Sequence, residues 1–551
     1  MQIYYNGNIY PVSGPGTSAL AVSRGRVAAV GGDRDILALK KPGDTVFDLR
    51  GACVLPGFHD SHCHLMMTAA HRRRIDLTGV KSIDGVRDKI MEYVKSHPPV
   101  KGASVPGGSP KGGPAPDNWI YCHRLNENFF PGGALPSAAQ LDAILPDRPL
   151  VIYRTCGHVA CLNSAALAAA GITRDTFVSG GAVDRYSNGM PTGVLRENAL
   201  GLISAVSQPR SKAEIKSLMR EGMDLAASKG LVCVHSNDCD GGGAAEFTEV
   251  MRELENENGC KLRVYEKISV DGVKMFEDLI YSGVKRGEGE LFTPGCLKLM
   301  TDGSMGGRTA YLRADYGDAP GERGIMAMEP EVIEAIVLKA QKEGWQTAMH
   351  AIGDGALDAC ITAVEHANLA YPAALRHRLV HCQVGDMQLY RRLAWAGMTA
   401  DIQPQFVPSD ALSLNLNKRL GKARASVSYA WKSLLELGVV CGGGSDSPVE
   451  PLDALAGIHS AVTRQNADGE PVGGWRPEER VTVAEAVHMY TIGGAYAAHM
   501  EDRLGTLGAG MLADFTVLGR DILSCPDEEI PHTRIMMTVV NGNVVYRDET
   551  Y

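Results

Sequence analysis

The chain has 551 residues and a formal net charge of −9, because 64 acidic side chains outnumber 55 basic ones. Hydrophobic residues make up 44% and charged residues 22%, which is typical of a globular protein and excludes global disorder. No basic run suits a nucleic-acid backbone, and no apolar run reaches the ~18 residues of a membrane-spanning helix. We therefore expect neither a nucleic-acid nor a membrane partner. The N-terminal residues also lack the pattern of a secretory signal.

The number and spacing of the cysteines indicate the cellular compartment of the protein. The thirteen cysteines are scattered singly along the chain, and none forms a C-x-x-C pair. An odd number of dispersed thiols is typical of a reduced protein without a disulfide framework. The sequence therefore predicts a cytoplasmic location.

Both ends of the chain have the pattern of short strands. Near the N-terminus, Asn6-Gly7 lies between two apolar runs and predicts a β-hairpin. Near the C-terminus, a strand at Asp514–Leu518 precedes a second predicted hairpin around Asn541-Gly542. The two β-rich ends predict one small sheet domain, built from residues 1–56 and 499–551. The alternative is two unrelated β tails.

The middle of the chain, residues 57–498, alternates apolar strands with amphipathic helices. Helical patterns cover Pro330–Glu343 and Leu357–Asn368. The strands are expected at 231–235, 296–300, 347–350, 378–381, 398–402 and 439–443. Six or more strand–helix units predict an α/β fold with a closed (β/α)₈ barrel. A Gly- and Pro-rich stretch at 98–116 predicts the start of an inserted segment near 98–150.

The sharpest feature is the segment Leu55–His64, which contains His62 and His64. In an extended strand, residues two apart point to the same face, so both imidazoles can bind one ion. Imidazole suits zinc, iron, nickel or copper. The alternative is a pair of histidines at a strand end with no role in metal binding.

Three more residues of these types follow predicted strands. His350 and His381 end two of them, and Asp446 follows a third after three glycines. The C-terminal ends of barrel strands meet at one mouth, where catalysis takes place in this architecture. Four histidines and one aspartate at successive strand ends therefore predict a metal site.

Lys298 lies within an apolar predicted strand. Burying its charge without a partner is costly. Its side chain either reaches the barrel rim or has a lowered pKa and takes up CO₂ as a carbamate. A carbamate has two oxygens and could bridge two metal ions.

Two further residues are candidates for substrate binding. Arg308 follows the Gly306-Gly307 turn and could bind a substrate carboxylate with two hydrogen bonds, or form a structural ion pair instead. His235 ends the predicted strand 231–235 and is expected to face the barrel mouth.

Several motifs together resemble those of a known family. They are Leu55–His64, Lys298–Ala310, His350–Asp354, Gln403-Pro404, Gly444–Val449, Tyr490-Thr491 and Gly510–Asp514. Over nearly the whole chain, the sequence resembles the amidohydrolase superfamily, in amidohydrolase family 3, the branch with N-substituted formamide deformylase-like enzymes. The resemblance implies a (β/α)₈ TIM-like barrel beside a small β-sandwich formed by both termini.

The resemblance also implies roles for the site residues. His62 and His64 would bind the more buried ion, carboxylated Lys298 would bridge, and His350 and His381 would bind a second ion. Asp446 would ligate the buried ion and act as the acid and base. The family commonly uses zinc, so we expect one or two divalent ions per chain.

Three more residues lie in motifs similar to those of the family. His158 and Asn163 match a motif near the substrate. Glu197 either lines the site, where it could bridge in place of Lys298, or is a solvated residue at a helix start. One departure is His59, which stands where the family often has an apolar residue and could confuse the assignment of ligands.

The expected function is that of a metal-dependent amidohydrolase that cleaves a non-peptide C–N bond in a small-molecule substrate. A deaminase, or a metal-dependent lyase, isomerase or decarboxylase, would use the same parts. A non-catalytic barrel is the further alternative, although it predicts lost ligands. A homodimer is compatible with the sequence.

Overall fold

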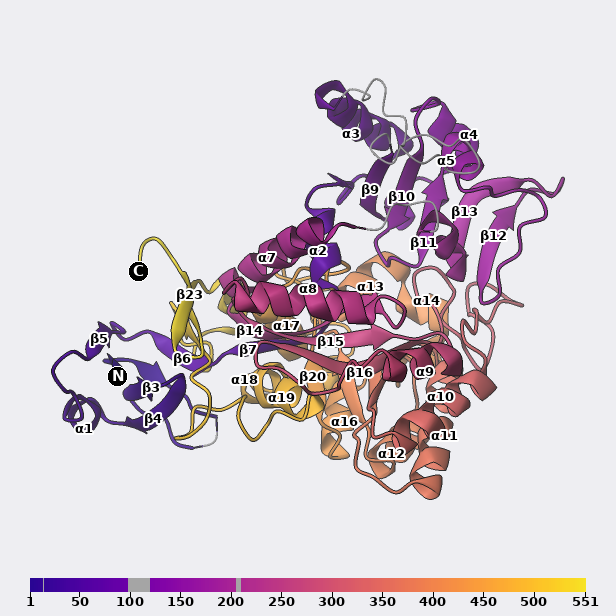
Figure 1. Ribbon diagram of the computed structural model, residues 1–551. Helices are drawn as coiled ribbons and strands as arrows, with labels where there is room; N and C mark the ends of the chain where they lie inside the picture. Colours follow the sequence, from indigo (N-terminus) through magenta and orange to yellow (C-terminus); the bar gives the residue numbers. More distant parts are fainter. Residues whose placement is uncertain (13, 98–118, 205–209) are drawn as a thin grey trace.

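The computed structural model describes residues 1–12, 14–97, 119–204 and 210–551. The Gly- and Pro-rich stretch 98–116 therefore lies outside the described residues. The described strands form four sheets, of four, five, six and eight strands. The largest occupies the centre of the molecule, and the sheets built from the chain ends lie to one side of it (Figure 1). In the described ranges, no helix is both long and apolar enough to cross a membrane.

Eight parallel strands form the central barrel. In sheet order they are β7 (Phe58–Cys63), β14 (Leu231–Asp240), β15 (Arg263–Ser269), β16 (Phe292–Met300), β17 (Thr347–Ala351), β18 (Arg378–His381), β19 (Thr399–Ile402) and β20 (Cys441–Gly443). The last strand meets the first where Asp446 donates its backbone N–H to the carbonyl of His62 over 2.7 Å. A Cβ at Gly444 would lie 2.7 Å from the nitrogen of His62, so this closure needs glycine.

Helices cover the outside of the barrel. The main ones are α7 (Lys212–Ser228), α8 (Ala244–Asn256), α9 (Val273–Tyr281), α10 (Pro330–Lys342), α11 (Asp354–Ala370), α12 (Met387–Trp395) and α16 (Trp431–Glu436). Local sequence sets where they begin: Ser211 caps α7 and Asp386 caps α12 through side-chain oxygens, and proline stands at the first position of α10. The predicted barrel fold is confirmed. Strand β15 was not predicted, because Glu266 and Lys267 interrupt its apolar pattern.

The chain ends build two facing sheets. One contains β1 (Gln2–Tyr5), β3 (Ala19–Ser23), β4 (Arg26–Gly31) and β5 (Thr45–Asp48). The other contains β2 (Asn8–Ile9), β6 (Cys53–Pro56), β21 (Phe515–Leu518), β22 (Ile535–Val540) and β23 (Asn543–Arg547). Their apolar faces share one core, in which the Tyr4 and Phe515 rings lie 5.0 Å apart. The predicted β-sandwich from both termini is therefore present.

Only one of the two predicted hairpins forms. Strands β22 and β23 pair antiparallel around Asn541-Gly542, whose positive φ values of 50° and 72° suit a tight hairpin turn. The N-terminal prediction was wrong. Strand β1 pairs with β3 and β5, whereas β2 pairs with β6 in the other sheet. Long-range pairing therefore overrides the local turn signal at Asn6-Gly7.

A six-stranded sheet is inserted between β7 and β14. It contains β8 (Ile75–Asp76), β9 (Ile120–Leu125), β10 (Leu150–Arg154), β11 (Val159–Leu162), β12 (Gly181–Arg185) and β13 (Pro191–Glu197). It carries the helices α3 (Ile83–Ser96), α4 (Ala138–Asp142) and α5 (Ser164–Ala169). The sheet begins before and ends after the segment near 98–150 that the sequence predicted to be inserted. It lies beside the barrel (Figure 1) and contributes the residues between β10 and β11 to the site described below.

Candidate metal centre

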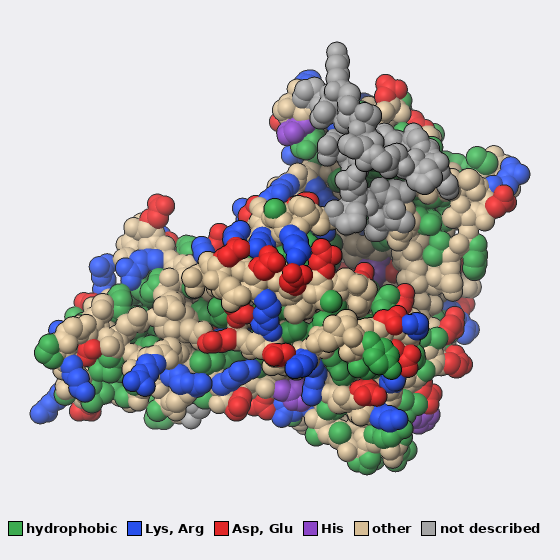
Figure 2. All heavy atoms as spheres, viewed as in Figure 1, with side chains coloured by type: hydrophobic (Ala, Val, Ile, Leu, Met, Phe, Trp, Pro, Cys, Tyr) green, Lys and Arg blue, Asp and Glu red, His purple; other side chains and the backbone are tan. Residues whose placement is uncertain are grey.

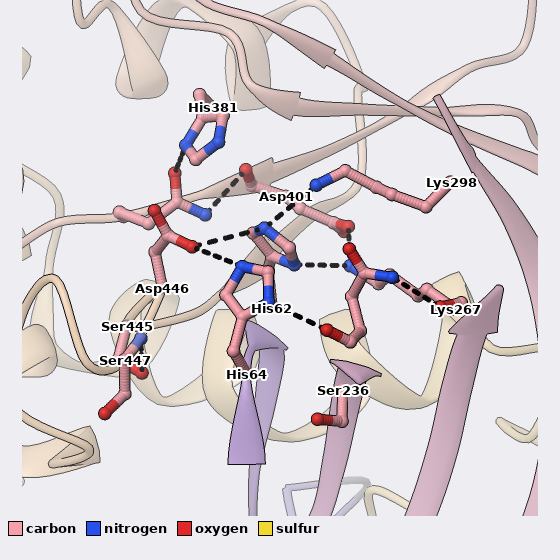
Figure 3. A network of polar contacts seen from close by, with 12 residues as sticks. His62, His64, Ser236, Lys267, Lys298, His381, Asp401, Ser445, Asp446 and Ser447 are labelled. Carbon is pink, nitrogen blue, oxygen red and sulfur yellow. Dashed lines mark hydrogen bonds and ion pairs between the residues drawn. The ribbon is translucent and has the colours of Figure 1, made fainter. Parts of the chain in front are cut away.

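Three predicted ligands converge at the C-terminal end of the barrel (Figure 3). Oδ1 of Asp446 lies 3.3 Å from Nε2 of His62 and 3.4 Å from Nε2 of His64. The two histidines project together because they are two residues apart at the end of β7. Asp446 has a φ of +54°, in the left-handed region, directly after the glycine-rich end of β20. One oxygen thus faces two imidazole nitrogens, as three ligands of one ion would.

The other three predicted ligands lie next to this group. Nζ of Lys298 is 3.3 Å from Nε2 of His62. The ring of His381 lies 5.5 Å from that of His62 and 4.5 Å from that of His350. Nε2 of His350 is buried and has no hydrogen-bond partner among the described residues. A buried nitrogen in this state is costly unless a ligand binds it.

Hydrogen bonds at Nδ1 orient three of the histidines. His64 donates to the carbonyl of Asn237 over 2.8 Å, and His350 donates to Asp302 over 2.9 Å. His381 donates to Oε1 of Gln403 over 2.8 Å. With the ring hydrogen on Nδ1, Nε2 of each neutral ring keeps its lone pair for a metal.

His62 is held differently, by a buried charge network that the sequence reasoning missed. Nζ of Lys267 lies 3.2 Å from Nδ1 of His62 and donates to Asp401 over 2.9 Å. Arg378 pairs with the same carboxylate at 2.7 Å, and the Lys267, Asp401 and Arg378 side chains are 0% exposed. Charged residues inside strands were the available signal, since such residues are rarely buried unless paired.

Burial and charge set the protonation of the centre. Burial keeps the pKa of His62 and of His350 well below the ordinary value and lowers that of His381 to about 3, so these rings are neutral at pH 7. Burial alone would raise the pKa of Asp446, but the contact with His64 and the nearby amine of Lys298 outweigh it and hold the pKa low. Neutral imidazoles and an ionised carboxylate form a donor set that fits a divalent metal.

A cavity of about 70 Å³ adjoins this centre, and His158, His350, His381 and Asp446 all line it. His158 pairs through Nδ1 with Glu197 at 2.6 Å, and its ring lies 5.0 Å from that of His350. Burial alone would lower the pKa of His158, but the Glu197 carboxylate raises it to about 9. His158 therefore lines the cavity as a cation that is paired with Glu197.

Arg308 and Asn163 lie elsewhere than the predicted substrate site. Arg308 forms two hydrogen bonds with Asp318, of 3.2 and 2.8 Å, and does not line this cavity, so the ion pair predicted as the alternative is present. The Asn163 side chain caps α5 by accepting from Ala166, and its amide donates to two backbone carbonyls. Its hydrogen-bonding capacity is used inside the inserted sheet, which corrects the predicted contact with substrate.

His235 is also corrected. Strand β14 continues to Asp240, so His235 lies inside the barrel and not at its mouth. Together with His59 and Cys233 it forms a second group of possible ligand atoms. Arg378, however, donates to Nδ1 of His235 over 2.9 Å. This bond ties the ring to the buried charge network, and none of His59, Cys233 and His235 lines the cavity beside Asp446.

Comparisons with known proteins find relatives over nearly the whole chain. The profile of the amidohydrolase family matches residues 45–546. The chain is 33% identical over 554 residues to a Bacillus subtilis protein named as the amidohydrolase YtcJ, covering 99% of both chains. It is 24% identical over 552 residues to the N-substituted formamide deformylase of Arthrobacter pascens, covering 98% of this chain and 97% of the other.

A solved structure has the same architecture over almost the full length. An uncharacterised metal-dependent hydrolase from Pyrococcus horikoshii OT3 superimposes with a TM-score of 0.74 at 25% identity, covering 96% of this chain and 99% of that one. The resemblance inferred from the sequence motifs is confirmed by these matches. The chain therefore belongs to the amidohydrolase family.

Proposed function

We propose that the protein is a metal-dependent hydrolase that cleaves a non-peptide carbon–nitrogen bond of a small molecule, in an amide, an N-formyl group or a cyclic amide. The observation that carries the proposal is the convergence of His62, His64 and Asp446, whose ligand atoms all lie within 4.8 Å of one another. The relative from Arthrobacter pascens, named an N-substituted formamide deformylase, supports the choice of bond.

We propose zinc as the metal, with one or two ions per chain. His62, His64 and Asp446 would hold one ion, and His350 and His381 the other. When bound, such ions lower the pKa of water and polarise carbonyl oxygens. The donor set, with nitrogen and carboxylate oxygen, is one that zinc accepts.

Lys298 would stand between the two ions as a carbamate. Burial, reinforced by the charge of Lys267, lowers the pKa of Lys298 to about 7. A large fraction of the amine is therefore uncharged at neutral pH. Its lone pair can attack CO₂, which forms an N–C bond and releases one proton. The resulting carbamate has two oxygens for the two ions.

Two side chains of the cavity would then act on the substrate. Asp446 takes a proton from the attacking water and passes it to the leaving nitrogen as the C–N bond breaks. The His158 cation, held by Glu197, donates a hydrogen bond to the substrate carbonyl oxygen, where negative charge develops. The products are a carboxylic acid and an amine.

Metal analysis and a hydrolysis screen test the proposal. N-formyl amines, N-acyl amino acids, cyclic amides and aminopyrimidines form the panel, with product analysis to separate amine release from deamination and from lyase, isomerase or decarboxylase chemistry. We expect divalent metal in the purified protein and its loss, together with activity, in His62→Ala. Turnover at the native rate by metal-free protein would overturn the proposal.

A cytoplasmic location, supported by thirteen free thiols, is part of the proposal, whereas a homodimer stays a prediction.

A further inference from the structure

A second cavity, of about 330 Å³, lies beside His64. Four arginines line it. Arg210 pairs with Glu214 at 3.9 Å, and we call the other three, Arg74, Arg124 and Arg154, the arginine vestibule. Arg154 also lines the cavity next to Asp446, so the two spaces adjoin at this side chain. The arginine vestibule is therefore in reach of a substrate whose C–N bond lies at the metal centre.

Two of these arginines have no carboxylate partner in the described part of the chain. Arg74 lies 5.1 Å from the Tyr121 ring centre and 5.7 Å from that of Tyr153, so aromatic faces contact its guanidinium. Burial lowers the pKa of Arg74, the charge of Arg210 lowers it further, and the Tyr153 hydroxyl opposes both. Neither Arg74 nor Arg124 has an ion pair within the described ranges, so both charges are free for a ligand.

The third arginine, Arg154, is a buried hydrogen-bond donor with a fixed orientation. The Arg154 side chain is 3% exposed, and its Nε donates to both carboxylate oxygens of Glu127, at 3.1 and 2.9 Å. The pair holds the guanidinium in place. Nη2 of Arg154 is buried and has no hydrogen-bond partner among the described residues. A buried N–H donor without an acceptor is costly, and a substrate oxygen would satisfy it.

The acidic side chain that lines this cavity, Asp238, already accepts hydrogen bonds from the protein. Asp238 accepts the backbone N–H of Met66 with both oxygens, at 3.1 Å, and the hydroxyl of Ser236. The vestibule therefore has an excess of positive charge in a chain whose net charge is −9.

Basic side chains on the outer surface differ in this respect. On the face shown in Figure 2, they are interspersed with acidic ones. Surface lysines also form ion pairs, and Nζ of Lys216 lies 2.6 Å from Oε1 of Glu257. A recessed group of arginines, two of which have no carboxylate partner among the described residues, concentrates positive potential at one place in an acidic protein. This local excess points to an anionic ligand.

We propose that the arginine vestibule binds a carboxylate of the substrate, and that the substrate class is therefore N-acyl or N-formyl compounds with a carboxylate group. This inference rests on the proposed function, because it places the scissile bond at the metal centre. Guanidinium groups match the planar geometry of a carboxylate with paired hydrogen bonds. The vestibule thus takes the role that the sequence assigned to Arg308.

A matched pair of probes tests the inference by calorimetric binding to the metal-loaded, full-length protein. The probes are N-formylphenylalanine and its carboxamide, which differ in one negative charge. We expect the carboxylate probe to bind about tenfold tighter or more, and this preference to shrink as salt rises from about 50 to about 500 mM. Equal affinity for the two probes, or no binding of the carboxylate probe, would overturn the inference.

Variants assign the preference to the arginines. We expect weaker binding of the carboxylate probe, and unchanged binding of the carboxamide probe, in each of the variants Arg74→Gln, Arg124→Gln and Arg154→Lys. Arg73→Gln is the matched control, because Arg73 is next to Arg74 in the chain but pairs with Glu221. If Arg74→Gln does not fold, the Arg124→Gln variant and the comparison of the two probes on the wild-type protein still test the inference. A preference that survives all three substitutions would overturn the assignment.

One more probe identifies the type of anion that binds. Comparing binding with hydrolysis then separates this inference from the proposed function. Tighter binding of N-formylphosphoethanolamine than of the carboxylate probe would replace carboxylate by phosphate and overturn the stated class. Binding and hydrolysis are measured as separate signals. Charge-dependent binding with no hydrolysis in the panel would reject the proposed function alone, whereas hydrolysis without charge preference would reject this inference alone.

Discussion

Oδ1 of Asp302 lies 2.9 Å from Nδ1 of His350, at the point where strand β17 turns into the loop before α11. The same carboxylate accepts the backbone N–H groups of Ile352 and Gly353, at 3.1 and 2.8 Å. Asp302 therefore fixes both the ring and the loop that follows it. Nε2 of His350 is left to face the metal centre.

Replacing this carboxylate should weaken metal binding. In Asp302→Asn, the side chain keeps its size but loses the charge that favours the Nδ1–H form of His350. We expect metal affinity to fall by about 10–100-fold, as measured by competition with a chelator of known affinity. Asp318→Asn serves as the control, because Asp318 pairs with Arg308 and Arg419 and not with a proposed ligand. Equal affinities in the two variants would contradict this role.

Lys298 should be a carbamate in the metal-loaded protein. Lys298→Ala removes the proposed bridge, so we expect fewer ions per chain by metal analysis and lower activity. Short carboxylates such as formate should restore part of that activity by filling the vacated space. Carbon-13 NMR after exchange with labelled bicarbonate should show the carbamate carbon in the wild type. Electron density for a bare amine in a fully metallated site would refute the carbamate.

Asp446→Asn should separate proton transfer from metal binding. The amide keeps one oxygen ligand but cannot accept a proton at neutral pH. We expect kcat to fall by about 10²–10⁴-fold, while metal analysis still finds the ion that the histidines hold. Near-native kcat at full metal occupancy would mean that another group moves the proton. Glu197, beside His158, would then be tested next.

The buried network beneath His62 should contribute strongly to stability. Asp401→Asn leaves Lys267 and Arg378 buried without their shared counter-charge. Breaking a buried ion pair by removing one partner costs about 3–5 kcal/mol, and urea unfolding measures this loss. Asp315→Asn, which breaks the exposed pair with Arg323, should leave the unfolding midpoint almost unchanged. Similar losses in both variants would show that burial of the network does not matter.

Two carboxyl groups of the cavity should make substrate binding depend on pH. Burial raises the pKa of Glu450 to about 7 and that of Asp410 to about 6. As pH rises through these values, both groups lose protons and the cavity gains negative charge. The KM of an anionic substrate should therefore rise across about pH 5 to 8, whereas that of a neutral analogue should not. Glu450→Gln should reduce the rise, and an unchanged profile would contradict the role of this residue.

Much of the fold and of the centre could be predicted because their signals are local. Alternating apolar segments and helical periods predicted the strand that ends at His381 and the helix that begins at Pro330. The two-residue spacing of His62 and His64 predicted their common direction, because side chains alternate along any strand. Parallel strands in a closed barrel then imply one mouth for His350, His381 and Asp446.

Other features depend on contacts that no local pattern encodes. The turn signal at Asn6-Gly7 is real, yet pairing with β6 carries β2 into the other sheet. Arg308 and Asn163 have side chains suited to substrates, but Asp318 and nearby backbone groups occupy their hydrogen bonds. The sequence by itself determined the barrel and the common direction of His62 and His64, because both follow from strand and helix periodicity, whereas the β-sandwich followed from the resemblance of its motifs to the family. Tertiary structure decided which polar groups are left unpaired at the site, since pairing depends on neighbours distant in the chain.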